Sequence, residues 1–251
     1  MTATPNEDRQ LAHPRAASVQ TYARIAGVLF LLSFVGGGFG EAYVPSKLIV
    51  SADATATAHN IQAFDSLFRM SFAGYLIEAV CDIALSLIFY VLLRPVYKNL
   101  ALLAAFFGLV STASYAACEL FYVAPLLILG GAGYLKTFAP DQLNTLALLS
   151  LKLFGYGASM FMVLYGVASV LRGYLIFRSG YLPKFLGVLT TLGGLAFIAR
   201  SFLLVLAPAY APGYLVLLIL PGALSLTVWL LVRGVDVGKW EERAVTSDVQ
   251  V

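Results

Sequence analysis

Two acidic residues lie inside a long apolar stretch of the chain. Glu78 and Asp82 are four residues apart within residues 71–93, so a helix places both carboxylates on one face, one turn apart. The rest of the stretch is apolar enough to cross a bilayer, where a charged side chain costs about 2.5–3.5 kcal/mol or more. Carboxyl groups accept and release protons, and carboxylate oxygens coordinate cations. The pair therefore predicts proton transfer or the binding of a small polar or cationic solute.

Further polar side chains fall at a similar depth of the predicted bundle. Counted at about 1.5 Å per residue from the predicted cytoplasmic helix ends, Glu78, Glu119 and Arg200 lie about 22–28 Å up. Asp82 lies lower, at about 16 Å, and Lys152 lies near the outer edge, at about 28 Å. Polar faces point into a bundle because lipid cannot hydrogen-bond to them. The sequence thus predicts a polar pocket that opens outward, lined by Glu78, Asp82, Glu119, Arg200, Tyr75, Ser86, Tyr115, Tyr122, Lys152 and Tyr156.

Two interpretations of these charges stay open. In the first, Arg200 pairs with Glu78 or Glu119, and the charges only fix the packing of the helices. The protein is then a non-catalytic structural or regulatory membrane subunit. In the second, the pocket binds or conducts a small solute or a proton, because ionisable residues inside a membrane are functional candidates by default. We favour the second, and the three acids against one deep arginine favour a proton or a cation over an anion.

The elements that hold these residues follow from composition. The 251 residues are 60% hydrophobic and 12% charged, with a mean hydropathy of +0.86, whereas about a quarter of the residues of a soluble domain are charged. The apolar residues form runs near or above the roughly 18 needed to span a bilayer. The fold class is therefore all-α, a polytopic membrane bundle of six transmembrane helices, at about residues 24–44, 71–93, 100–129, 146–171, 184–206 and 214–232.

The tails and the short loops predict an orientation. Residues 1–20 are expected to be a disordered tail without a cleavable signal peptide, and residues 234–251 a second polar tail. Lys and Arg number eleven on the side of the two tails and four on the other side, when the residues at the loops and helix ends are counted. The positive-inside rule then places both termini in the cytoplasm.

Three local features carry narrower predictions. Residues 53–63 are rich in Ala and Thr and predict a short surface helix capped by Ser51 or Asp53. Pro125 predicts a kink near the far end of the third span. Gly36 and Gly40 form a GxxxG pair suited to close contact between helices.

Several kinds of chemistry are excluded by missing motifs. The two histidines, His13 and His59, lie outside the predicted spans, so a bis-histidine haem inside the bundle is excluded. Cys81 and Cys118 lie in apolar runs without a CxxC pattern and are expected to be small buried residues. There is no HExxH, no Walker A sequence and no basic patch with interleaved aromatic residues. We expect no catalytic residue, no cofactor, no bound metal and no nucleic-acid partner; the expected partner is the lipid bilayer.

Several short segments also resemble a known family. They are residues 23–27, 81–84, 90–96, 140–143, 155–157 and 173–183. Together they resemble a bacterial family of multi-span membrane proteins catalogued as domain of unknown function 4386, over about residues 20–233. The resemblance implies a six-helix protein of the bacterial inner (plasma) membrane and carries over no catalytic residue. Similar sequences often have a histidine before the Gly-Tyr-Gly of the fourth span, where this chain has Phe154.

Overall fold

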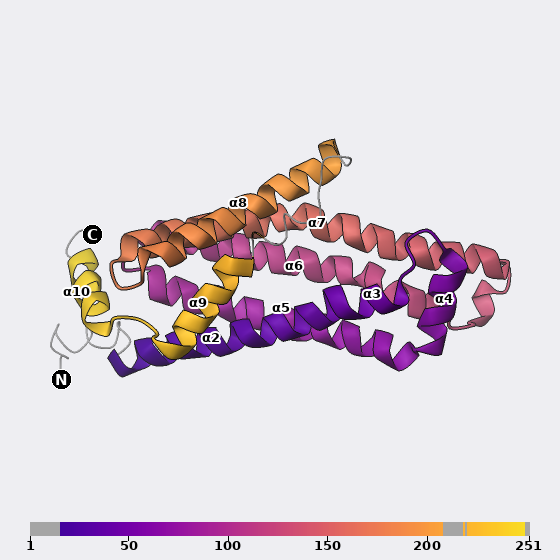
Figure 1. The fold of residues 1–251 in the computed structure, drawn as a ribbon, viewed down its shortest axis with the longest axis horizontal. Helices are drawn as coiled ribbons and strands as arrows, with labels where there is room; N and C mark the ends of the chain where they lie inside the picture. The colour runs from indigo at the N-terminus through magenta and orange to yellow at the C-terminus, as the bar shows by residue number, and fades with distance from the viewer. Residues whose placement is uncertain (1–15, 208–217, 219, 249–251) are drawn as a thin grey trace, which may run out of the picture.

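The structure, a computed structural model, describes residues 16–207, 218 and 220–248, and every regular element in these ranges is helical. Five helices are long and apolar enough to cross a membrane, and α9 with α10 makes a sixth candidate if this bent pair counts as one span. The predicted all-α membrane bundle is confirmed (Figure 1). The elements are α2 (Ala16–Gly37), η1 (Gly38–Tyr43), α3 (Val44–Leu48), α4 (Ala54–Ala63), α5 (Asp65–Leu93), α6 (Lys98–Ile128), η2 (Gly133–Leu135), α7 (Pro140–Ser179), α8 (Lys184–Leu206), α9 (Leu220–Val232) and α10 (Val237–Asp248).

The long helices form a closed ring in which each packs mainly against its neighbours. The order around the ring is α2, α5, α6, α7, α8 and α9, and α9 closes the ring against α2. Side chains that point away from lipid therefore meet in the middle of the ring. The start of α2 and the helix α10 lie at one end of the bundle, and α4 lies across the other end beside α7 (Figure 1).

Facing glycines bring two pairs of helices into backbone contact. A methyl group added to Gly36 of α2 would lie 2.9 Å from the carbonyl oxygen of Gly74 of α5, and the reverse distance is the same. Two glycines of α7 face two glycines of α8 at 2.6–2.7 Å by the same measure: Gly166 with Gly194, and Gly173 with Gly187. Small residues of this kind let membrane helices approach closely. The pairs α2–α5 and α7–α8 are thus tightly joined units.

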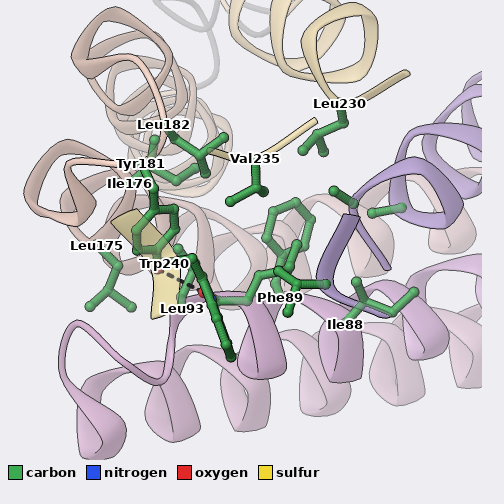
Figure 2. Close-up of a cluster of buried hydrophobic side chains, with 14 of the residues drawn as sticks. Ile88, Phe89, Leu93, Leu175, Ile176, Tyr181, Leu182, Leu230, Val235 and Trp240 are labelled. Atoms are coloured by element: carbon green, nitrogen blue, oxygen red, sulfur yellow. Dashed lines mark hydrogen bonds between the residues drawn. The ribbon is translucent and has the colours of Figure 1, made fainter. Parts of the chain in front are cut away.

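The end of the bundle that carries α10 is closed by a large apolar cluster. The chain turns by 101° between α9 and α10, so α10 lies across the bundle end. Its Trp240 is 1% exposed and packs among residues of α5, α7 and the α7–α8 turn (Figure 2). The indole N–H of Trp240 donates to the carbonyl oxygen of Leu92 at 2.9 Å, and the Tyr181 hydroxyl donates to the same oxygen at 2.7 Å. We call this the inner core, because the predicted orientation places it at the cytoplasmic side.

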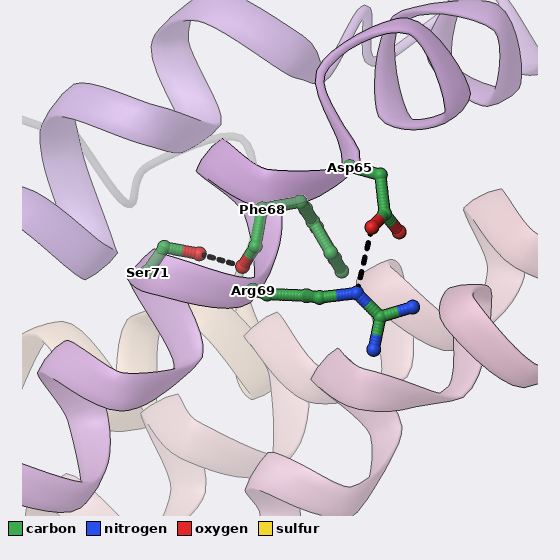
Figure 3. A network of polar contacts seen from close by, with 4 residues as sticks. All are labelled: Asp65, Phe68, Arg69 and Ser71. Atoms are coloured by element: carbon green, nitrogen blue, oxygen red, sulfur yellow. Dashed lines mark hydrogen bonds and ion pairs between the residues drawn. The ribbon is translucent and has the colours of Figure 1, made fainter.

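The opposite end has a second apolar cluster under α3 and α4. Val44, Leu48, Ile61 and Phe68 are fully or almost fully buried there. At the start of α5, the Arg69 Nε atom lies 2.7 Å from Asp65 Oδ2 (Figure 3). Both side chains are exposed, so water and salt screen the attraction between them. The packing of α3 and α4, rather than this ion pair, holds the outer end together.

Several predicted boundaries agree with the structure. The fifth span lies at Lys184–Leu206, as predicted. The predicted surface helix is α4, and its cap is Asp53, whose Oδ1 accepts a hydrogen bond from the Ala56 amide at 2.9 Å. Pro125 lies inside α6 near its end at Ile128, and the kink expected there stays a prediction. The N-terminal residues of an α-helix lack intrahelical partners for their amides, which is why the Asp53 carboxylate fits this position.

Other boundaries differ. Helix α2 begins at Ala16, within the predicted tail, and residues 1–15 lie outside the described residues. The first span does not stop before Pro45 but continues through η1 and α3, because a proline in the first helical turn costs no hydrogen bond. Helix α7 has 40 residues and ends at Gly180, whose φ of 78° suits glycine. The second predicted tail forms α10. Residues 208–217 and 219, which include the start of the predicted sixth span, lie outside the described residues.

Candidate functional site

Three glutamates from three different elements gather in the half of the ring toward α3 and α4, which the predicted orientation places outward. Glu41 comes from η1, Glu78 from α5 and Glu119 from α6, and Glu41 acts electrostatically on both others. A methyl group added to Gly37 would lie 2.8 Å from Glu78 Oε2, so this carboxylate rests against the backbone of α2. We call Glu41, Glu78 and Glu119 the outer acidic cluster. Glu78 and Glu119 were predicted from the sequence, whereas Glu41 was not.

Two oxygen atoms of this cluster are buried without a hydrogen-bond partner among the described residues. They are Oε2 of Glu78 and Oε1 of Glu119. Glu119 is only 2% exposed. A buried polar atom left unpaired costs about 1–3 kcal/mol, and more when the group is charged. Such atoms gain most from a proton or from a cation that donates hydrogen bonds.

Glu41 lies in a π-helical segment, and its side chain is exposed. Its carboxylate accepts a hydrogen bond from the Tyr115 hydroxyl across the ring. π-Helical turns within longer helices occur often at functional sites. The sequence signal for Glu41 was present, since it is the sole acid of the predicted first span, but the neighbouring glycines and Pro45 indicated the end of that span.

Arg200 of α8 acts on Glu41 rather than on the acids predicted to pair with it. No carboxylate of the described residues lies within 4.0 Å of its guanidinium group. Arg200 is half-buried. The predicted close pairing with Glu78 or Glu119 is therefore wrong for this structure, and Arg200 is a distant counter-charge of the outer acidic cluster.

Aromatic rings pack beside the outer acidic cluster. Tyr75, Tyr115, Tyr122 and Phe154 lie with ring centroids 4.9–6.3 Å apart. The Tyr75 hydroxyl donates to the Gly40 carbonyl at 3.0 Å, and the hydroxyls of Tyr122 and Ser71 lie 2.6 Å apart. Three tyrosines predicted for the pocket thus come together, and they hold η1 beside α5 and α6.

A second charged centre lies deeper, toward the inner core. Asp82 Oδ1 accepts a hydrogen bond from the Ser33 hydroxyl of α2 at 3.2 Å. The positive charge that acts on Asp82 is that of Arg172 of α7. The guanidinium group of Arg172 lies 5.6 Å from the ring centroid of Phe89 and 5.5 Å from that of Tyr165, in cation–π contact with both. We call Asp82 and Arg172 the inner charge pair.

Arg172 was expected in a cytoplasmic loop and is instead a buried residue of α7. It is 5% exposed, and its Nε atom has no hydrogen-bond partner among the described residues. A methyl group added to Gly108 would lie 2.7 Å from both Arg172 Nη2 and Ser86 Oγ. Ser86 is thus beside the inner charge pair. Because α7 continues to Ser179, Arg172 lies about 10 Å inside the helix end.

Lys152 and Tyr156 do not join the other predicted pocket residues. Both are exposed on the outside of α7, and Tyr156 is 53% exposed. The reason is the length of α7: measured from Ser179, Lys152 lies about 40 Å along the helix, beyond a hydrocarbon core about 30 Å thick. A lysine at that height meets water and needs no buried partner.

The arrangement suits proton or cation chemistry more than metal chemistry. Among the described residues, no group of three or more His, Cys, Asp or Glu side chains is arranged to hold a metal ion. Two surface hollows lie elsewhere, one beside Phe138 and Asp141 and one between α7 and α8 beside Tyr174. Neither hollow is lined by a residue of the outer acidic cluster or the inner charge pair.

Apolar helices of spanning length around a charged interior define a multi-pass membrane protein. The chain belongs to the family described as Domain of unknown function (DUF4386), whose model matches residues 25–234. It is also similar to an uncharacterized protein of Archaeoglobus fulgidus, with 26% identity over 165 residues, which are 65% of this chain and 83% of that protein. No solved structure matches the chain significantly. The predicted family is confirmed.

Proposed function

We propose that this protein binds protons or a small cationic solute at the outer acidic cluster and conducts them toward the inner charge pair. The observation that carries the proposal is the pair of buried, unpartnered oxygens on Glu78 and Glu119. A proton or an ammonium-type donor supplies the missing hydrogen bonds, while an anion would add repulsion to three carboxylates. Glu41, which is exposed, offers the first acceptor on the path from the outer side.

The charge balance of the interior supports the same choice. Four acids interact electrostatically with one another, namely Glu41, Glu78, Asp82 and Glu119, against two arginines that act on them from α7 and α8. The excess of carboxylates attracts cations and protons.

The orientation in the membrane is part of the proposal. With Arg172 moved into the bundle, ten Lys and Arg residues lie on the side of the termini and four on the other side. This asymmetry favours termini in the cytoplasm. As part of the same proposal, the protein lies in the inner (plasma) membrane of a bacterium, which the family resemblance supports, with the outer acidic cluster near the external face.

A second candidate is a non-catalytic structural or regulatory subunit whose charges only fix helix packing. The hydrogen bonds from Ser33 to Asp82 and from Tyr115 to Glu41 favour it, because they tie α2 and η1 to α5 and α6.

Reconstitution of the full chain in liposomes separates the two functions. The vesicles contain a pH-sensitive dye and carry a potassium diffusion potential, and both proton entry and uptake of labelled methylammonium are measured. We expect uptake of at least one probe above protein-free vesicles, and loss of that uptake in the double variant Glu78→Gln, Glu119→Gln. The matched control is Glu241→Gln, which neutralises an exposed acid of α10. If the wild type takes up neither probe and the double variant is only more heat-stable, the structural function holds instead.

A further inference from the structure

Glu78 and Asp82 share one face of α5 with two side chains that lie against Arg172. Ser86 and Phe89 follow Asp82 at four and seven residues, so the four side chains form one stripe down the helix. Arg172 meets the inner end of this stripe, beside Ser86 and over the Phe89 ring. The stripe thus runs from the outer acidic cluster, past Asp82, to a fixed positive charge.

We infer that Asp82 is a second proton acceptor, which receives its proton from Glu78, and that Arg172 is the positioning residue that keeps Asp82 ready to receive it. The inference rests on the proposed function and applies to its proton-conducting form. In the step, the O–H bond of the Glu78 carboxyl breaks and an O–H bond forms on the Asp82 carboxylate. Glu78 becomes the carboxylate, so charge and atoms balance without a further reactant. The proton moves about one helical turn, 5.4 Å, a span that side-chain motion or one water bridges.

Two neighbouring groups favour the carboxylate form of Asp82 against its burial. Ser33 donates a hydrogen bond to one carboxylate oxygen, and Arg172 supplies the positive charge. Acting against them are the carboxylates of Glu78 and Glu41. The thiol of Cys81 and the phenol of Tyr165 also lie in its electrostatic range.

The contacts of Arg172 hold its guanidinium group in one position. Two aromatic rings flank its guanidinium group, and the backbone at Gly108 lies against its tip. It does not close on Asp82, since no carboxylate of the described part of the chain lies within 4.0 Å of it. A close ion pair would occupy both Asp82 oxygens, whereas a charge at a distance favours the carboxylate and leaves an oxygen free for the proton.

The apolar inner core lies between Arg172 and the end of the bundle that carries α10. Inward of Arg172, side chains such as Leu92, Leu175 and Leu186 are fully buried against one another. Asp82 therefore lies between the outer acidic cluster and the apolar inner core. The fixed charge of Arg172 also opposes the passage of any other cation beyond Asp82.

Infrared spectroscopy of the full chain in nanodiscs tests the role of Arg172 without any need for transport. The carboxyl band that disappears in Asp82→Asn reports protonated Asp82. At pH 7 we expect Arg172→Gln to raise this band about tenfold or more, because loss of a nearby opposite charge favours the neutral acid. Arg172→Lys keeps the charge and should restore the wild-type band. Arg178→Gln, which removes an exposed arginine of the same helix, should leave it unchanged. A band that Arg172→Gln does not change would overturn the inference.

Proton entry into liposomes tests the role of Asp82. We expect Asp82→Asn to reduce proton entry to the level of protein-free vesicles, Arg172→Gln to reduce it about tenfold, and Arg172→Lys to retain most of it. Wild-type vesicles without proton entry would refute proton conduction itself. Normal proton entry in Asp82→Asn, with loss of entry in Glu78→Gln, would refute only the second acceptor and leave the proposed function standing.

Discussion

Two side-chain donors share one backbone carbonyl at the inner end of the bundle, and their effects on stability should not add. The carbonyl oxygen of Leu92 accepts hydrogen bonds from Trp240 and Tyr181. The amide of Val96, which would serve this oxygen in a continuing helix, donates to Leu93 instead. We therefore predict that Trp240→Phe and Tyr181→Phe are each mild and are severe together.

The magnitude follows from the number of donors left. Each single variant removes one hydrogen bond, worth about 0.5–1.5 kcal/mol, while the other donor still satisfies the Leu92 carbonyl. The double variant leaves a buried carbonyl unpaired, which costs about 1–3 kcal/mol in addition. We expect the double variant to exceed the sum of Trp240→Phe and Tyr181→Phe by about 1–2 kcal/mol.

Hydrogen–deuterium exchange of the α10 amides is the assay, because it measures the free energy of opening this helix from the bundle. The control is Trp229→Phe. The indole N–H of Trp229 donates to the Gly234 carbonyl at 3.0 Å and does not reach Leu92, so Trp229→Phe combined with Tyr181→Phe should be additive. Additive effects of Trp240→Phe and Tyr181→Phe would refute the reasoning.

Three further predictions concern other parts of the fold. Gly187→Ala places a methyl group 2.6 Å from a backbone oxygen of α7. In thermal unfolding of the detergent-solubilised protein, it should lower the stability by about 1–3 kcal/mol. Gly155→Ala has nothing within 4 Å of its new methyl group and should raise the stability by about 0.5–1 kcal/mol. Asp53→Ala removes the cap of α4 and should speed amide exchange of that helix, at a cost of about 1 kcal/mol. Hydrogen bonds from the amide and the side chain of Lys239 lower the pKa of Asp236. The amides of the α9–α10 turn should therefore keep their protection from hydrogen exchange at neutral pH and lose it only as the pH falls below about 3.9. Asp236→Asn should remove this pH dependence.

Opposite outcomes would be as informative. Equal stability of Gly187→Ala and Gly155→Ala would mean that α7 and α8 separate easily. Unchanged α4 exchange in Asp53→Ala would mean that tertiary packing, and not the cap, sets the helix start. A loss of protection that begins near neutral pH would assign the titration at the α9–α10 turn to a group other than Asp236.

The apolar runs predicted the helices because burial in lipid leaves the chain no other regular structure. Lys184–Leu206 is the clearest example, since Pro183 before it and the end of the apolar run after it mark both limits. Glu78, Asp82 and Glu119 were also found, because an acid within such a run stands out against its neighbours.

The partners of these acids were harder to predict than the acids themselves. Arg172 follows an apolar run directly, where an arginine usually marks the membrane surface, and nothing local shows that α7 continues for seven more residues. Lys152 was misplaced for the same reason. Which arginine lies near which acid depends on the packing of α7 against the rest of the ring. The spacing of residues along the sequence does not determine that packing.

The facing glycines divide the charges of the interior between two bodies. Glu41, Glu78 and Asp82 belong to the α2–α5 unit and its continuation η1, whereas Arg172 and Arg200 belong to the α7–α8 unit. Any displacement of one unit from the other would separate all three acids from both arginines at once. With an effective dielectric constant of 20, separating one pair of unit charges from about 5 to about 8 Å takes about 1 kcal/mol. Protonation of an acid reduces that electrostatic work. Binding of a proton in the interior would therefore also make the α2–α5 and α7–α8 units easier to separate.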